Sequence, residues 1–289
     1  MIAWTMRCLP GLGRAPEPHL LSASAPSLYA PFVTRSLELF SKAGIELLPY
    51  SLADETLLSR AGVAGSGKRT ENVELSVSAY RSDTIRQARI ALIEGGDALQ
   101  VLNFCIFPSL DCPNLPTFAA DLVTLPGGHL IALDYAPNGH ELASDAVYAP
   151  SSALATAFER HRATLPDGGP IPEDSKRFFS PYFLWSRLPK GEESDALISN
   201  AVLPAFEEYL DGYLQLVVDA ERSNEHSSSS SSSGSRQQTA REAQLAYSQY
   251  RADEDPARPM LSRLFGEEYA ERVIREVLFD LPLRIDQQA

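Results

Sequence analysis

Residues 99–134, "LQVLNFCIFPSLDCPNLPTFAADLVTLPGGHLIALD", decide the fold of this 289-residue chain. The stretch holds two apolar runs, 99–107 and 118–125, and a third run that follows the Pro-Gly-Gly turn at 126–128. Short apolar runs bounded by turn residues predict buried strands. Because the connections between them are too short for a crossover helix, we expect the strands to pair as antiparallel neighbours.

The segments that flank this stretch should extend the sheet. Upstream, residues 72–80 and 84–96 alternate polar and apolar side chains, and the second run should place Arg86 on one face with Ala88 and Ile90. Downstream, "RFFSPYFLWSRL" is typical of a further aromatic strand or strand pair. Together these runs predict an antiparallel meander.

Helical spacing surrounds the sheet in the sequence. Apolar residues recur at helical intervals over 27–60, 194–220 and 239–281, with a break at Asp255-Pro256. Pro204 should either kink its helix or lie in the first turn. An order of helix, sheet and helices predicts an α/β fold, with helices packed on the faces of one sheet in a single domain over 1–289.

Two segments are expected to lie outside the packed core. The serine-rich residues 222–238 should form a surface loop, which a domain accommodates at little cost in stability. Residues 1 to about 20 are expected to be disordered. Their first 16 residues are interpreted either as an ordinary N-terminus or as the tail of an organelle transit peptide.

Composition excludes several classes of function. The formal charge of −13 and the pI near 4.9 argue against general nucleic-acid binding, which needs a basic surface. No apolar run is long enough to predict a membrane span. Three cysteines without a CxxC pair and five histidines without an HExxH motif predict a reducing compartment and no metal site.

Residues 62–70, "GVAGSGKRT", resemble a phosphate-binding loop, but Arg69 occupies the hydroxyl position. Such a loop also needs a buried strand before it and a helix after it. Here the preceding residues look helical and a strand follows. We therefore expect a flexible, basic surface loop.

Asp121 is the anomaly of the central stretch, because a carboxylate in an apolar run is costly to bury. If the two runs pair as neighbours, Asn103 and Asp121 project from the same face. Burial would then raise the pKa of Asp121 and suit it to act as a general acid. The alternative is a structural carboxylate held by a backbone amide or an arginine, and spacing alone favours this alternative.

The same residues resemble a known family. The stretch 99–134, the strand "FFSPYFLW" and the C-terminal "YSQYRADEDPARPMLSRLFGEEYAERVIREVLFDLP" are similar to the signature segments of the ferredoxin-dependent bilin reductases. The resemblance implies a three-layer α/β/α sandwich around a central antiparallel sheet. It also implies reduction of an open-chain tetrapyrrole by single electrons from ferredoxin, without a bound flavin or metal.

The resemblance assigns roles to individual residues. Asp121 matches the catalytic aspartate of the family, and Asp255 matches a second aspartate found in members that reduce the A-ring diene. The alternative for Asp255 is an N-cap, because Asp-Pro is typical of a helix start. Arg251, one helical turn earlier, is expected to orient Asp255 or to bind a propionate of the bilin, with Arg258 as a second candidate.

Two departures from the family pattern bear on the substrate. Asn103 and Ala91 stand where the phycocyanobilin-forming branch has a histidine and a glutamate, which argues against phycocyanobilin formation. Asn103 is therefore expected to bind substrate. The favoured activity is A-ring reduction of 15,16-dihydrobiliverdin to phycoerythrobilin. The alternatives are reduction of biliverdin to 15,16-dihydrobiliverdin or to another bilin, and a non-catalytic bilin carrier.

The expected partners are ferredoxin, the bilin substrate and another bilin reductase that hands over the substrate, with no nucleic acid and no membrane. The resemblance implies a plastid stroma or a cyanobacterial cytoplasm.

Overall fold

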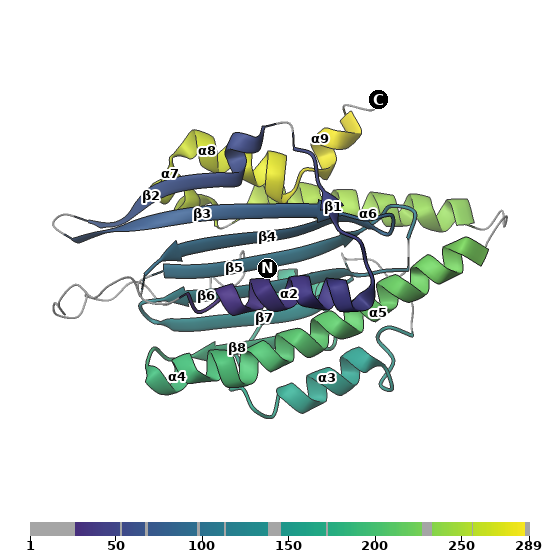
Figure 1. Ribbon diagram of the computed structural model, residues 1–289, viewed down its shortest axis with the longest axis horizontal. Helices are drawn as coiled ribbons and strands as arrows, with labels where there is room; N and C mark the ends of the chain where they lie inside the picture. The colour runs from purple at the N-terminus through teal and green to yellow at the C-terminus, as the bar shows by residue number, and fades with distance from the viewer. Residues whose placement is uncertain are drawn as a thin grey trace.

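The computed structural model describes residues 27–286 except 53, 67–68, 97–98, 113, 138–145, 172, 227–232 and 256. These residues form an eight-stranded antiparallel sheet in the order β1-β3-β4-β5-β6-β7-β8, with β2 also paired to β3 (Figure 1). The strands are β1 (Leu48–Pro49), β2 (Ser59–Ser66), β3 (Arg69–Arg81), β4 (Ile85–Gly95), β5 (Leu99–Pro108), β6 (Thr117–Leu125), β7 (Gly128–Ala136) and β8 (Leu184–Leu188). The predicted meander is confirmed.

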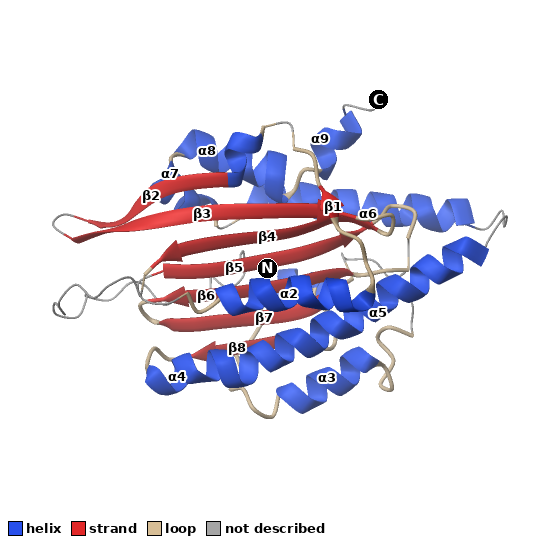
Figure 2. Cartoon of the chain, in the orientation of Figure 1, coloured by secondary structure: helices blue, strands red, loops and turns tan. Residues whose placement is uncertain are grey.

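Helices cover both faces of the sheet, which confirms the three-layer sandwich (Figures 1 and 2). One face packs against α2 (Ala30–Ala43), α3 (Ala153–His161), α4 (Glu192–Leu197), the π-helical turn η3 (Ile198–Val202) and α5 (Leu203–His226). The other face packs against α6 (Ser233–Glu254), α7 (Arg258–Phe265), α8 (Glu267–Arg272) and the π-helical turn η4 (Val273–Leu278), with α9 (Leu281–Asp286) beyond.

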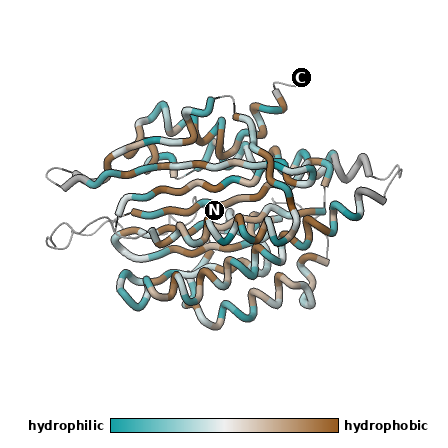
Figure 3. Tube along the Cα trace, in the orientation of Figure 1, coloured by the Kyte–Doolittle hydropathy of each residue, from teal (hydrophilic) through white to brown (hydrophobic). Residues whose placement is uncertain are grey.

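The central strands carry the two hydrophobic cores. All residues of β5 and β7, and nearly all of β6, are buried, because helices lie above and below them. Figure 3 shows apolar residues along these strands and a mixture of apolar and polar residues along the helices. A strand that is buried on both faces exposes no side chains to solvent, so its polar and apolar residues need not alternate. This explains why these runs are apolar throughout.

The predicted helix over 27–60 is wrong beyond residue 43. Helix α2 ends at Gly44, whose φ of 74° lets its N–H reach the carbonyls of Phe40 and Ser41. The chain then forms β1, the 3-10 turn η1 (Glu55–Leu58) and β2. The expected loop at 62–70 is also wrong, because all of it except residues 67–68 lies in the β2–β3 hairpin. A strand on each side excludes the geometry of a phosphate-binding loop.

Arg86 does not share a face with Ala88 and Ile90. The ladder between β4 and β5 shifts register between Ile85 and Gln87, and such a bulge interrupts the alternation of faces. Arg86 therefore turns toward the C-terminal helices, where it forms an ion pair with Asp280 at 2.9 Å.

Several helix and loop boundaries also differ from expectation. Helices α5 and α6 extend into the serine-rich segment from both sides, so the predicted loop at 222–238 is wrong at its flanks, and its centre lies outside the described residues. The first 26 residues also lie outside them. Within "RFFSPYFLWSRL" only β8 is a strand. Pro204 lies in the first turn of α5, and the chain leaves helix α6 before Asp255 as expected.

Candidate active site

A row of aligned residues crosses the sheet on the face that packs against α6 and α7. Ala91 on β4 pairs with Asn103 on β5, Asn103 pairs with Asp121 on β6, and Asp121 pairs with Ala132 on β7. The two polar residues thus lie side by side between two alanines. Small neighbours leave space above a sheet, and that space is where a ligand can approach the polar pair.

Asp121 is the carboxylate at the centre of this row. It is fully buried, and its Oδ1 accepts a hydrogen bond of 3.0 Å from Nδ2 of Asn103. Its Oδ2 has no hydrogen-bond partner among the described residues. Burial raises the pKa of Asp121 to about 6, against a smaller opposing effect of the Asn103 hydrogen bond and the Arg251 charge. A carboxyl group with this pKa holds its proton near neutrality more readily than an exposed one.

Arg251 lies in the last turn of α6, and Asp255 directly follows the end of this helix. Both are buried, and Nη2 of Arg251 lies 3.4 Å from Oδ2 of Asp255. Their charges act on Asp121 in opposite directions, since Arg251 lowers its pKa and Asp255 raises it. The sequence-predicted residues thus form two contacting pairs, Asn103 with Asp121 and Arg251 with Asp255, which lie near enough for their charges to act on each other.

Asp255 contacts both the turn into α7 and the buried arginine, although the N-cap of α7 is Ala257 and the catalytic role of Asp255 stays a prediction. Its Oδ1 accepts a hydrogen bond of 2.8 Å from the backbone N–H of Ala257, which stabilises the turn into α7. Its Oδ2 faces Arg251. The turn therefore positions the carboxylate and leaves its second oxygen directed at the buried arginine.

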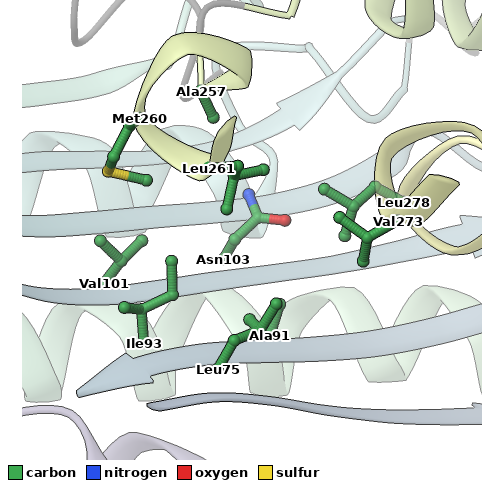
Figure 4. Close-up of a pocket in the computed structure, with 10 residues that line it drawn as sticks. All are labelled: Leu75, Ala91, Ile93, Val101, Asn103, Ala257, Met260, Leu261, Val273 and Leu278. Carbon is green, nitrogen blue, oxygen red and sulfur yellow. The ribbon is translucent and has the colours of Figure 1, made fainter. Parts of the chain in front are cut away.

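A small apolar cavity adjoins Asn103 (Figure 4). It is covered by side chains of α7 and η4, among them Met260, Leu261 and Leu278. Asn103 is the polar side chain in its lining, and Ala91 contributes to its floor.

Arg258 is not brought to this cluster. Its guanidinium donates to the backbone carbonyls of Ala252 and Asp253 and forms an ion pair with Glu271. These contacts hold it at the junction of α6 and α7. A role for Arg258 in substrate binding therefore has no support in its present contacts.

The sequence reasoning missed Arg89. It lies on β4, two residues from Ala91 and on the same face, and it is fully buried. Its guanidinium lies over the ring of Phe279, 5.7 Å from the centroid. The available signal was the alternation of β4, which places Arg89 and Ala91 together. Ser248 on α6, also fully buried, was missed as well, because a serine in a helix carries no distinctive signal.

Metal binding and membrane insertion find no support in the described part of the chain. Its His, Cys, Asp and Glu side chains form no group of three or more that could hold a metal ion. Among its helices, none combines the length and the apolar character that a membrane crossing requires. That the protein carries no flavin or metal stays a prediction.

Comparisons with known proteins give the family. The sequence profile described as "Ferredoxin-dependent bilin reductase" matches residues 41–280. A phycoerythrobilin:ferredoxin oxidoreductase from a Synechococcus species is 46% identical over 82% of this chain and 86% of its own length. The same enzyme from Nostoc punctiforme is 38% identical over 90% and 95%.

A solved structure agrees with these relatives. Tomato phytochromobilin synthase, crystallised in complex with biliverdin, superposes with a TM-score of 0.70 at 26% identity and covers 88% of this chain and 83% of its own. The chain therefore belongs to the ferredoxin-dependent bilin reductases and is an oxidoreductase that reduces a bilin with electrons from ferredoxin.

Proposed function

We propose that this protein reduces the A-ring diene of 15,16-dihydrobiliverdin to give phycoerythrobilin. The observation that carries the proposal is that two buried carboxylates, Asp121 and Asp255, lie near enough for their charges to interact, next to an apolar cavity that Asn103 and Ala257 line. Members with both aspartates are those that the sequence resemblance linked to A-ring reduction. The activity named for the Synechococcus and Nostoc relatives points the same way.

The chemistry needs two electrons and two protons for each bilin. Reduced ferredoxin supplies the electrons one at a time, and each electron raises the basicity of the conjugated system, so that a nearby acid protonates it. In the proposal Asp121 donates one proton and Asp255 the other. Asn103 orients Asp121 through its hydrogen bond, and Arg251 orients Asp255. The apolar cavity wall shelters the radical from water.

Ferredoxin and the bilin are the partners that the family requires. The finer parts of the expectation belong to this proposal: operation without a bound flavin or metal, transfer of substrate from another bilin reductase, and location in a plastid stroma. Both oxidoreductase relatives compared above come from cyanobacteria, which does not favour the plastid over a cyanobacterial cytoplasm.

Anaerobic turnover with reduced ferredoxin tests the activity. The protein is incubated in parallel with 15,16-dihydrobiliverdin and with biliverdin, and the products are identified by absorbance and chromatography. We expect phycoerythrobilin from the first substrate. Conversion of biliverdin alone, to 15,16-dihydrobiliverdin, would instead identify the enzyme that acts earlier. Binding of both bilins without reduction would leave the carrier function.

The pH dependence of turnover should follow Asp121. Because its pKa is raised to about 6, the carboxyl group is protonated below this pH and loses its proton above it. The protonated fraction then falls about tenfold for each further pH unit, so kcat should fall with rising pH above about 6. Single-turnover rates with pre-reduced ferredoxin, measured from pH 5 to 9, check this. A rate independent of pH over this range would contradict Asp121 as the rate-limiting acid.

A further inference from the structure

Arg89 presents a buried charge that makes no ion pair with any described residue. Its side chain is fully buried, and none of its three guanidinium nitrogens has a hydrogen-bond partner among the described residues. A guanidinium is charged in proteins and carries five N–H donors. Burial of such a group without a partner costs several kcal/mol, so folding alone gives no reason to keep it.

The surroundings of Arg89 do not supply the missing anion. Its cross-strand neighbours on the cavity face are Cys105 on β5 and Ala79 on β3. The ring of Phe279 lies beneath the guanidinium, and a second cation, Arg251, lies 5.2 Å from the centroid of the same ring. Asp255 is the carboxylate that contacts Arg251, and Asp121 also lies near enough to interact with that arginine.

A second polar group near α6 is also unpaired. Oγ of Ser248, one helical turn before Arg251, is buried and has no partner among the described residues. Nε of Arg251 and Oδ2 of Asp121 are also buried and have no hydrogen-bond partner among the described residues. The region beneath α6, next to residues that line the cavity, thus holds the unpartnered donors of Arg89 and Arg251 and the hydroxyl group of Ser248.

We propose that the positive charge of Arg89 stabilises the reduced bilin. It acts after the first electron arrives and before the first proton is transferred. In that step reduced ferredoxin is oxidised by one electron and the bilin becomes a radical anion, with no bond broken. Asp121 then gives its proton, which leaves an aspartate anion and a neutral radical. The site near Arg89 therefore gains one negative charge, first on the bilin radical anion and then on the aspartate anion. The conjugated system of the oxidised bilin adds no such charge.

The location of Arg89 suits this role. Ala91 lines the cavity two residues along the same strand face, and Leu278, beside Phe279, also lines it. One fixed charge acting across roughly 6–12 Å of protein changes an equilibrium on the order of 10- to 100-fold. The benefit exists only after reduction, so it accelerates the reaction without tightening substrate binding. The inference rests on the proposed position of the bilin in this cavity.

The test uses three variants of the full chain. Arg89→Met removes the charge and keeps an apolar side chain of similar length, and Arg89→Lys keeps the charge. Arg86→Met is the matched control, because Arg86 lies on the same strand but is paired with Asp280. For each protein we measure the Kd for 15,16-dihydrobiliverdin, the single-turnover rate with reduced ferredoxin, the reduction potential of the bound bilin and the Tm.

We expect Arg89→Met to bind the oxidised bilin within about threefold of wild type, to shift the bilin potential to more negative values and to reduce it about 10- to 100-fold more slowly. Its Tm should be unchanged or higher, because an unpaired buried charge is gone. Arg89→Lys should recover most of the rate. Arg86→Met should lower the Tm, because Asp280 loses its buried partner, and should leave the potential unchanged.

Three results would overturn the inference. A wild-type rate and potential in Arg89→Met would remove the electrostatic role. A loss that falls on Kd alone would make Arg89 a contact for a carboxylate of the bilin. A lower Tm with equal defects in Arg89→Met and Arg89→Lys would make it a packing residue. Failure of the wild-type protein to reduce any bilin would instead contradict the proposed function.

Discussion

Asp121→Asn is expected to lower kcat by about 100- to 10,000-fold while the bilin still binds, since this is the range that a positioned general acid contributes. The substitution preserves the shape of the side chain and removes its transferable proton. The buried position and the contact with Asn103 can both persist, because an amide oxygen accepts the hydrogen bond that Asn103 now donates to Oδ1. Because proton transfer is blocked in this variant, the bilin should accept an electron and remain as a long-lived radical. Absorbance and electron paramagnetic resonance would detect this radical.

Asp134 provides the matched control for Asp121. It is also a fully buried strand carboxylate, and burial raises its pKa to about 7. Both of its oxygens, however, are used by Ser180, through the backbone N–H at 2.9 Å and the hydroxyl group. Asp134→Asn should therefore lower the Tm and leave turnover per folded molecule near wild type. Equal loss of turnover in both variants would show that burial of a carboxylate, rather than the proton of Asp121, is what matters.

Asp255→Asn is expected to affect both stability and turnover. The amide can still accept the hydrogen bond from Ala257, so the turn into α7 should form. Arg251 loses its buried counterion, and breaking a buried ion pair from one side costs about 3–5 kcal/mol of folding free energy. Turnover should stop after the first proton transfer, with a half-reduced bilin as the species that accumulates. Chemical denaturation and single-turnover spectra measure the two effects separately.

A double variant separates the structural role of Asp255 from the catalytic one. Asp255→Asn combined with Arg251→Met removes both charges, so most of the lost stability should return because no unpaired ion remains. Turnover should stay low, because the proton donor is still absent. If the double variant regained the wild-type rate, Asp255 would serve only to hold the turn and its arginine.

Much of the site followed from strand periodicity. Asn103 and Asp121 were predicted to share a face if their strands paired, and they are direct cross-strand partners. The break after α6 was likewise visible in the Asp-Pro pair. The assignment of Asp121 as an acid needed more, because the same spacing fits a structural carboxylate. Its free Oδ2 and the cavity next to Asn103 favour the acid, and both are features of packing between distant segments.

The errors in the fold share a physical cause. Residues 45–60 carry helical spacing, yet their best partners lie in β3, and pairing with a long strand outweighs a weak local preference. The bulge at the start of β4 interrupts the alternation of side chains between the two sheet faces, although the polar and apolar residues of the sequence alternate there without a break. The guanidinium of Arg258 contacts Glu271 and the carbonyls at the end of α6, so its role in substrate binding stays a prediction.

The sequence by itself determined the strands of the central meander, their order and the face on which Asp121 lies, because these depend on a period of two and on short connections. Only the tertiary structure decided which of several charged residues meet. Arg89 lies more than 160 positions before Arg251 and Asp255 in the chain, and their proximity depends on how α6 lies across β4 and β5. Burial then sets their chemistry, since the same carboxyl or guanidinium group in water would carry no such cost and no such function.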